Sequence, residues 1–403
     1  AGGGAAGGLD PGPRRPASVT GAAAPLPSRG LRAALVIAQA SGFTAALAAG
    51  LGLDSGAAAY GVIVAALVVR PDFSRWPLPV YPVLVGLSGL SMAIGLLIGE
   101  AFAGAPEVFV FGLVAALMQV LMLLLPGALR PLGNVLAITG VLPLLNATSS
   151  WLSLGNELAA IALGLVVGSV VQVVWSPAGH QAPAEEPEPA AADPPLAARL
   201  AAGLASPFFW RKLVVAVLAL PIGEGLGAVA PKYLYFGVVL LLNDSLGATL
   251  ARVRDRMVGV SLGVLMPLLV FDSFGLSPLS TAVVMGGTAA LVVALQGEAY
   301  LRTALISSGV AFVGYGPLVA WYIPHRWLDY LLGSALAVAA GLLFRPTSAL
   351  QQYRALLRRS PVAQDAARRL YPAALEEARW TGQVPPALPP VPGPPAQATP
   401  VGP

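Results

Sequence analysis

Long apolar runs recur along the chain, and they restrict its fold more than any other feature. The ranges 79–99 and 278–296, for example, contain no charged side chain. A run of about 20 apolar residues, coiled as a helix, crosses the hydrocarbon core of a membrane. Only 10% of all residues are charged, against about 25% in ordinary soluble domains. The sequence therefore predicts an all-α, polytopic integral membrane protein whose first partner is the lipid bilayer.

Twelve membrane helices are expected, six on each side of a Pro-rich acidic stretch near the middle of the chain. This predicts six regions: a disordered N-terminal arm (1–28), a first membrane half (29–176), a linker (177–208), a second membrane half (209–346), cytoplasmic amphipathic helices (347–384) and a disordered Pro-rich tail (385–403). The expected helices lie at about 33–53, 57–70, 79–99, 107–125, 132–148, 157–175, 211–229, 233–244, 257–272, 278–296, 302–322 and 327–344.

The distribution of basic residues predicts which way these helices run. If both termini are cytoplasmic, all of the 23 Lys and Arg except Lys232 and Arg326 fall on the cytoplasmic side. Cytoplasmic loops of membrane proteins are enriched in Lys and Arg, so this orientation is expected. The loops then assigned to the outside carry acids: Asp54, Glu100, Glu107, Glu157 and Asp272.

Similar positions in the two halves predict an internal repeat. Gly164 and Gly333 have the same offset as Pro177 and Pro346, and Tyr60 corresponds to Tyr235 at a slightly larger offset. Each half has an even number of expected helices, so the two repeats would have the same orientation. We therefore expect two parallel six-helix repeats.

Several function classes lack the residues that they need. The chain has no cysteine, and its two histidines, His180 and His325, lie near segment ends, so we expect no disulfide, metal site or cofactor. Neither Lys212 nor Lys232 lies in a phosphate-binding loop sequence. No nucleophile and base are paired at a spacing typical of hydrolases. We therefore predict that the chain is not an enzyme. Nucleic acid is not an expected partner, and homo-oligomer formation is left open.

The stretch 232–269 contains most of the candidate functional residues. Its apolar run is short and ends at Asn243 and Asp244, and we predict a basic turn at 252–256 before the next helix. The corresponding segment of the first half, 57–69, is short too, and short segments at matching places in two repeats are typical of a transport site. A helix extended through its flanks, with Asn243 capping the next turn, is the structural alternative.

Part of this stretch resembles a known family. The motif Arg256-Met-Val-Gly259-Val-Ser-Leu-Gly263 resembles the R-x-x-G-x-x-x-G turn and helix of the fusaric-acid-resistance-like family of aromatic acid exporters. The segment 233–256 resembles the short helix and basic loop before that motif. His325 to Gly333 is similar to the family's R-x-x-D-x-x-x-G segment. The first half matches in layout only, and has Asn156 and Glu157 where the second half has Arg and Asp.

The resemblance implies an efflux protein of the bacterial inner membrane that exports aromatic or other weak organic acids, and it implies kinship with organic-anion channels. We therefore expect a gradient-driven transporter whose partner is a small organic anion. An organic-anion channel and a membrane scaffold that transports nothing are the alternatives. Proton dependence would separate the transporter from the channel.

Each candidate residue has a functional and a structural interpretation. Arg252 and Arg256 are expected to attract an anion, or else to set topology through lipid headgroups. Glu224 is a proton-coupling candidate, or else it lies at the outer surface. Asn243, Asp244, Tyr235 and Asp329 complete the predicted substrate site, although Asp329 and Arg326 are also candidates for an ion pair near the outer face. The glycines expected at helix contacts are Gly95, Gly99, Gly259, Gly263 and Gly333.

Overall fold

The computed structural model describes residues 26–70, 79–145, 149–176, 194–228, 230–343, 348–359 and 364–384. Throughout these ranges the chain is helical and has no β-strand. Most of the predicted arm and linker, and all of the predicted tail 385–403, lie outside the described residues. The last part of the predicted linker is a helix, α7 (Leu196–Leu204), which meets the next helix at 72°.

Helices occupy all twelve ranges expected from the sequence, although their bounds differ. In the first half they are α1 (Leu26–Gly50), α2 (Ser55–Val68), α3 (Val80–Ala101), α4 (Glu107–Leu124), α5 (Gly133–Val141) and α6 (Trp151–Trp175). After α7 come α8 (Pro207–Gly225), α9 (Leu234–Leu241), α10 (Leu246–Gly263), α11 (Leu265–Phe274), α12 (Pro278–Ala294), α13 (Leu301–Gly309) and α14 (Val319–Leu343). The chain ends in α15 (Ala349–Arg359) and α16 (Gln364–Thr381). Short 3-10 turns cover Gly127–Leu132, Leu142–Leu144, Pro231–Tyr233, Glu298–Tyr300 and Gly316–Leu318, and a π-helical turn covers Val310–Gly314.

Length and composition divide these helices into two groups. Six described segments are long and apolar enough to cross a membrane, or seven if α7 and α8 form one bent span. The six include α10 and α11 together as one segment, Leu246–Phe274. Four other apolar helices are shorter: Ser55–Val68, Gly133–Leu144, Pro231–Leu241 and Pro278–Ala294. The prediction of an all-helical membrane protein is confirmed, whereas twelve spans and two repeats stay a prediction.

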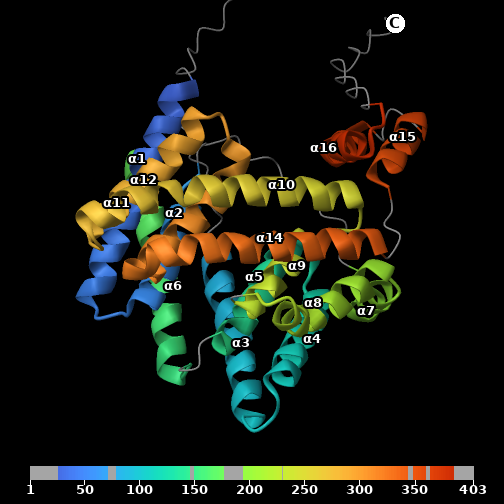
Figure 1. Cartoon of the computed structure of the whole chain (residues 1–403), viewed down its shortest axis with the longest axis horizontal. Helices are drawn as coiled ribbons and strands as arrows, with labels where there is room; N and C mark the ends of the chain where they lie inside the picture. The colour runs from blue at the N-terminus through green and yellow to red at the C-terminus, as the bar shows by residue number, and fades with distance from the viewer. Residues whose placement is uncertain are drawn as a thin grey trace, which may run out of the picture.

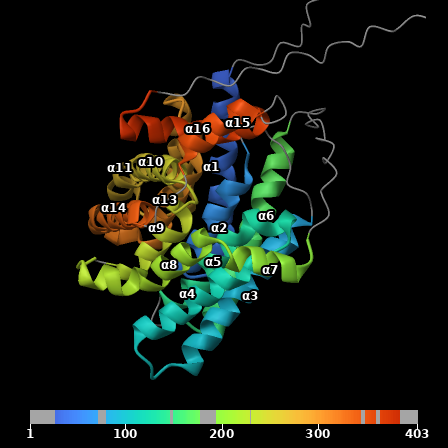
Figure 2. The same cartoon turned by 90° about the vertical axis from the view of Figure 1, so that its right-hand side faces the viewer.

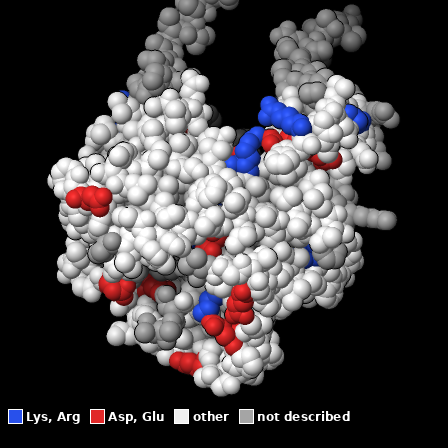
Figure 3. Space-filling model, viewed as in Figure 1, with Lys and Arg blue, Asp and Glu red and all other residues white. Residues whose placement is uncertain are grey.

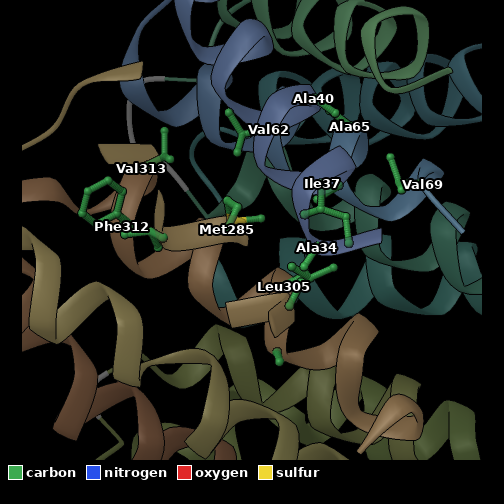
Figure 4. Close-up of a cluster of buried hydrophobic side chains, with 14 of the residues drawn as sticks. Ala34, Ile37, Ala40, Val62, Ala65, Val69, Met285, Leu305, Phe312 and Val313 are labelled. Carbon is green, nitrogen blue, oxygen red and sulfur yellow. The ribbon is translucent and has the colours of Figure 1, made fainter. Parts of the chain in front are cut away.

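Helices of each half pack against helices of the other half. Helix α1 of the first half lies along α12 of the second, and α8 of the second half lies along α4 of the first. Figure 4 shows the core that results at one of these contacts, where Ala34 and Ile37 of α1 and Val62 of α2 meet Met285 and Leu305. A second core joins α3, α4 and α5 to α8, α9 and α14. The two largest cores are therefore shared between the halves, whereas smaller clusters lie within each half.

Small residues allow the helix backbones to approach closely. A Cβ added to Gly164 of α6 would overlap the Gly61 carbonyl of α2, and one added to Gly237 of α9 would meet Gly333 of α14. Gly95 lies in the same way against Gly140 of α5. Among the other glycines singled out from the sequence, a Cβ on Gly259 would meet Thr303, one on Gly263 would overlap Ala304, and Gly99 has only Leu144 nearby.

Helices α10 and α14 cross the molecule side by side, roughly at right angles to α1, α3 and α6 (Figure 1). Figure 2 shows the same pair end-on, beside the upright helices. The N-terminal end of α10 lies below the C-terminal hairpin of α15 and α16, and the first turn of α1 lies at the same end of the molecule. In Figure 3 more of the basic side chains lie toward this end, whereas acidic ones predominate at the opposite end.

The structure corrects the predicted ends of three helices. Residues 252–256 are not a turn, because α10 begins at Leu246, where the Ser245 hydroxyl caps it by accepting from the Ala248 N–H (3.3 Å). Glu157 is not in a loop, because a capping box formed by Ser150 and Ser153 starts α6 at Trp151. Arg326 is not in an outer loop either, because α14 continues through Pro324. In all three cases the helix includes polar residues that we had assigned to a turn or loop. A capping serine starts α10 and α6 earlier than expected, and α14 tolerates Pro324.

The two C-terminal helices form a hairpin that packs on α10. Their buried side chains include Leu350 and Tyr353 of α15 and Ala367 of α16. The carboxylate of Glu376 forms an ion pair with Arg254, while that of Glu377 accepts from the Ala349 N–H (2.8 Å) and so caps α15. The amphipathic helices expected at 347–384 are present, and their apolar faces pack on each other and on α10.

Labelling of single cysteines tests the predicted orientation. Gly104 is exposed between α3 and α4, with open space around its Cα, and Trp380 of α16 is 65% exposed. We expect Gly104→Cys to react with a membrane-impermeant maleimide in intact cells. Trp380→Cys should react only after the cells are permeabilised, because the hairpin is expected in the cytoplasm. The opposite pattern would reverse the orientation.

Replacing Gly263 tests the close approach of α10 and α13. We expect Gly263→Leu to lower stability by at least about 1–3 kcal/mol, since the added side chain has to displace the backbone at Ala304. The measurement is the thermal unfolding of purified protein in one detergent. Gly86→Leu is the matched control, because Gly86 is an exposed helix position with nothing near its Cα. Equal melting temperatures for the two variants would contradict the role of Gly263.

Candidate functional site

A break in the backbone separates α9 from α10, and the predicted residues Asn243 and Asp244 form it. Helix α9 has only 8 residues, which corresponds to about 12 Å of the roughly 30 Å hydrocarbon core. The Asn243 N–H donates to the Thr249 hydroxyl (3.0 Å), and that hydroxyl donates to the Ser245 carbonyl (3.0 Å). Ser245 therefore caps α10, whereas our structural alternative assigned this cap to Asn243.

Two arginines bind the carbonyl groups that the short helix leaves unpaired. Arg211 of α8 donates from Nη2 to the carbonyls of Asn243 (2.7 Å) and Asp244 (3.2 Å). Arg252 of α10 donates to the Leu240 carbonyl (3.4 Å). With the Asn243 amide in the orientation that satisfies its neighbours, its oxygen also accepts from Arg252 Nε (2.8 Å) and Nη1 (3.1 Å). Positive charge at the C-terminal end of a helix is electrostatically favourable, so part of this basic cluster is structural.

Lys212 adds a third positive charge to this cluster. Its side chain is only 8% exposed, lies within electrostatic reach of Arg252, and makes no hydrogen bond to another described residue. A buried ammonium group without a hydrogen-bond partner is costly. Asp244 is an acidic residue that acts electrostatically on Arg211 and Arg252, and Lys212 adds a further positive charge next to Arg252. The cluster therefore has an excess of positive charge that suits an anion.

One face of α10 leads from this cluster toward a second one. Arg252 and Arg256 lie one turn apart on one side of α10, and Val260 and Val264 continue at the same spacing, each turned about 40° farther around the helix axis. The Arg256 guanidinium lies over the ring of Tyr330 of α14, 4.8 Å from its centroid. Val260 and Val264 line a small cavity farther along, about 18 Å from Arg252 by helix rise.

Arg326 of α14 is the charged residue beside this cavity. It is 7% exposed, and its guanidinium carbon lies 3.1 Å from the centroid of the Tyr233 ring and 5.0 Å from that of Tyr330. Tyr322 lies on the same side at 5.8 Å and stacks on Tyr315, with ring centroids 3.6 Å apart. Arg326 therefore lies among aromatic rings, each of which attracts a cation through its π-face.

The hydrogen-bonding groups around Arg326 are incompletely used. Nε and Nη1 of Arg326, the Tyr322 hydroxyl and the Ser307 hydroxyl are buried and have no partner among the described residues. All three residues line the cavity, together with Val310 of the π-helical turn. The cavity measures ≈ 10 Å³, about the space of one water molecule. Buried polar groups are nearly always paired, so the unpaired groups around this cavity mark it as a candidate binding site for water or a polar ligand.

Other predicted residues have structural contacts instead. Tyr235 is fully buried, donates to the Ala137 carbonyl (3.0 Å) and packs edge-on against Phe111. Glu224 is exposed at the last turn of α8, which agrees with its surface alternative. Asp329 is buried and accepts from the Ala230 N–H (3.1 Å), so it holds the segment before α9 against α14.

Of the residues predicted for a site, Asn243, Asp244 and Arg252 lie together at the break and Arg256 lies over Tyr330, whereas Arg326 beside the cavity was not among them. One signal was available, since Tyr322, Arg326 and Tyr330 recur at four-residue spacing in a helix-forming segment. The expected helix 327–344 began one residue after Arg326, so Arg326 was assigned to an outer loop as an exception to the positive-inside rule.

The other well-formed hollow has a different character. A groove of ≈ 350 Å³ between α1 and α6 is lined mostly by valine, with Phe43 and Leu47 on its α1 side. Its polar groups, Gln39 and Trp175, bond to each other (2.7 Å). Among the described residues, no group of three or more His, Asp or Glu side chains is placed to hold a metal ion. The groove suits apolar chains rather than an anion.

Comparison with known proteins agrees with the resemblance found in the sequence. Residues 214–340 match a family model described as fusaric acid resistance protein-like. The matched region begins in α8 and ends in α14, so it includes Arg252, Arg256 and Arg326. No curated protein and no solved structure matches the chain. The family indicates a membrane protein of transport or efflux.

Arg211 and Lys212 are neighbours whose replacement should have different effects on stability. We expect Arg211→Met to lower the free energy of unfolding by about 1–3 kcal/mol, because two partly buried hydrogen bonds from a charged donor to backbone carbonyls are lost. Lys212→Met should leave stability unchanged or raise it, because it removes a buried charge without a hydrogen-bond partner. Thermal unfolding in one detergent measures both. A larger loss for Lys212→Met than for Arg211→Met would contradict these roles.

Proposed function

We propose that this chain, whose residues 214–340 are fusaric acid resistance protein-like, is a gradient-driven exporter of small organic acids, aromatic acids among them. Its place would be the bacterial inner membrane, with both termini in the cytoplasm. The observation that carries this proposal is Arg326, a buried guanidinium with two unpaired N–H groups beside a cavity in an apolar span.

The chemistry around Arg326 fits a carboxylate attached to an apolar or aromatic body. A guanidinium holds a carboxylate through two parallel hydrogen bonds, and Nε and Nη1 are the unpaired groups here. The hydroxyls of Tyr322 and Ser307 can donate to the same anion. The rings of Tyr233 and Tyr330 would flank the body of the ligand, since aromatic rings pack edge-on or offset against one another.

The basic face of α10 gives this anion a path to Arg326. Arg211, Lys212 and Arg252 would gather it from the cytoplasm at the end of the molecule that bears the hairpin. Arg256 lies between this cluster and the cavity, one helical turn beyond Arg252 and over the same Tyr330 ring that faces Arg326. Closely spaced positive charges replace part of the hydration that the anion loses.

The closed cavity favours a carrier that opens to one side at a time over a channel. Space for about one water is too small for any organic acid, so the Tyr315–Tyr322 stack has to separate before a ligand binds. The π-helical turn Val310–Gly314 lies directly beside that stack. Such turns are frequent at functional sites, and this one has the position of a movable element.

The proposed fold has twelve membrane helices in two parallel six-helix repeats. The reciprocal packing supports it, because the first helix of each half lies along the fourth helix of the other. The close contact of Gly61 with Gly164 has a counterpart at Gly237 and Gly333, between the second and sixth helices of each half. In this arrangement the anion path lies in the second half, and its cavity faces the first.

Replacement of Arg326 tests the proposed site. Arg326→Ala should abolish the tolerance that the gene gives to cells challenged with a panel of aromatic and aliphatic acids. Arg326→Lys should retain a small part, because it keeps the charge and loses the paired donors. In proteoliposomes, Arg326→Ala should lower benzoate exchange at least tenfold. Arg379→Ala, at an exposed position of α16, is the control. Normal insertion with wild-type exchange in Arg326→Ala would refute the site.

A further inference from the structure

The apolar groove between α1 and α6 owes its shape to the side chains of its two walls. On the α1 wall Phe43 and Leu47 are long, and both are exposed. The α6 wall consists of valines, which are short and branched at Cβ: Val166, Val167, Val170, Val171 and Val174. Long side chains beside short ones leave a hollow of ≈ 350 Å³ along the two helices.

The packing of α6 on α2 turns this valine face outward. Gly168 of α6 packs directly against the backbone of Ala65 in α2. Val166 and Val170 lie on the opposite side of α6 from Gly168, and both are exposed. Val171 is buried and belongs to the core that α1 shares with α2. The groove therefore has a packed floor and opens to the surroundings of the protein.

One end of the groove is polar. The Trp175 indole N–H donates to the side-chain oxygen of Gln39 (2.7 Å). The amide nitrogen of Gln39 has no hydrogen bond to another described residue. Gln39 is exposed on an otherwise apolar stripe of α1, with Leu35 one turn before it and Phe43 one turn after it. The amide N–H groups are thus available to a polar group at the end of the groove.

The end of α6 indicates the level of this polar pair in a membrane. Residues 176–193, which follow Trp175 in the sequence, include four acids. Charged groups are costly within hydrocarbon, so Trp175 is expected at the membrane surface, where Trp is enriched. From Gln39 to Leu47, α1 rises about 12 Å, which is close to the roughly 15 Å of hydrocarbon in one leaflet. The groove therefore has about the length of one layer of acyl chains.

Arg32 lies beyond the polar pair on the same side of α1. Two helical turns separate it from Gln39, so the two side chains share one face of the helix, and Arg32 is exposed. The rise between them is about 10 Å, which places Arg32 at the headgroup layer outside the hydrocarbon core. A guanidinium binds phosphate through charged hydrogen bonds. Along α1 the order is apolar groove, amide and guanidinium, and in a phospholipid it is acyl chain, ester and phosphate.

We infer that the groove between α1 and α6 binds one phospholipid, with an acyl chain against the valines, an ester carbonyl at the Gln39 amide and the phosphate at Arg32. This site goes beyond the proposed function, because none of its residues belongs to the anion path. An acyl chain fits the groove better than a second copy of the chain does. The two walls contact each other, whereas a helix with its side chains is about 10 Å wide.

Native mass spectrometry of the full-length protein, with dioleoylphosphatidylglycerol titrated in one detergent, tests the groove. Val170→Trp fills it, so wild-type protein should bind the first lipid roughly tenfold more tightly than this variant does. Val283→Trp, at an exposed position of α12 outside the groove, is the matched control and should bind like wild type. Val174→Trp, at the most exposed of the groove valines, should repeat the loss, which covers the case in which Val170→Trp fails to fold.

Arg32→Gln tests the phosphate contact. Loss of a charged hydrogen bond should weaken binding of dioleoylphosphatidylglycerol roughly tenfold. Binding of dioleoylglycerol, which has no phosphate, should not change. Arg369→Gln, at an exposed position of α16, is the control. The melting temperature gives a second measurement, because a lipid that binds the folded protein raises it, and it shows whether each variant is folded.

Three outcomes would overturn the inference. The first is equal lipid affinity of wild-type protein and both tryptophan variants in the groove. The second is a wild-type dimer that Val170→Trp converts to a monomer, since a second copy would then occupy the groove. The third is an equal effect of Arg32→Gln on both lipids. All three concern binding at α1 and α6, so the test of Arg326 is independent of them.

Discussion

Close contact between helix backbones is the constraint on which this structure depends. In a bilayer, burying a leucine against another helix gains little over leaving it in lipid, so association relies on dense packing of small residues. Gly61 against Ala160, Gly164 against Gly61 and Gly263 against Ala304 are such contacts. The last of these contacts also positions the cavity, because Val264 of its lining follows Gly263. The geometry of the polar cluster is thus set by residues without chemistry of their own.

The buried cations show how a membrane protein separates structural from functional charge. Arg211 binds two carbonyls that no helix satisfies, so its charge completes the backbone at the α9–α10 break. Arg326 has no such task, because it lies among tyrosine rings with two N–H groups unpaired. The cost of burying it is reduced by the π-faces around it. The unpaired N–H groups of Arg326 are what the proposed anion would bind.

Patterns along the sequence predicted the helical segments well and their polar ends poorly. Apolar runs gave the approximate location of the twelve expected helices but not of α7, which lies in the predicted linker. Small-residue spacing singled out Gly259 and Gly263, which the structure places against α13. The polar contacts at the helix ends depend on residues that are distant in the sequence. The spacing of Asn243, Asp244 and Arg252 indicated a site, yet nothing local shows that Arg211, 32 residues from Asn243, fills the break between them. Arg326 and Glu157 were assigned to loops because the expected helices began at the apolar runs, and those runs show neither the capping by Ser150 nor the tolerance of Pro324.

The exchange of partners between the two halves has a consequence for synthesis. Helix α1 presents Ala34, Ala38 and Gly42 to α12, and α12 is not made until most of the chain has left the ribosome. Until then the small-residue face of α1 is in contact with lipid alone. Insertion of the early helices and assembly of the core are consequently separate events. The core that α1 shares with α12 forms only after the second membrane half has been made. A premature end anywhere before Pro278 would leave α1 inserted and without its partner.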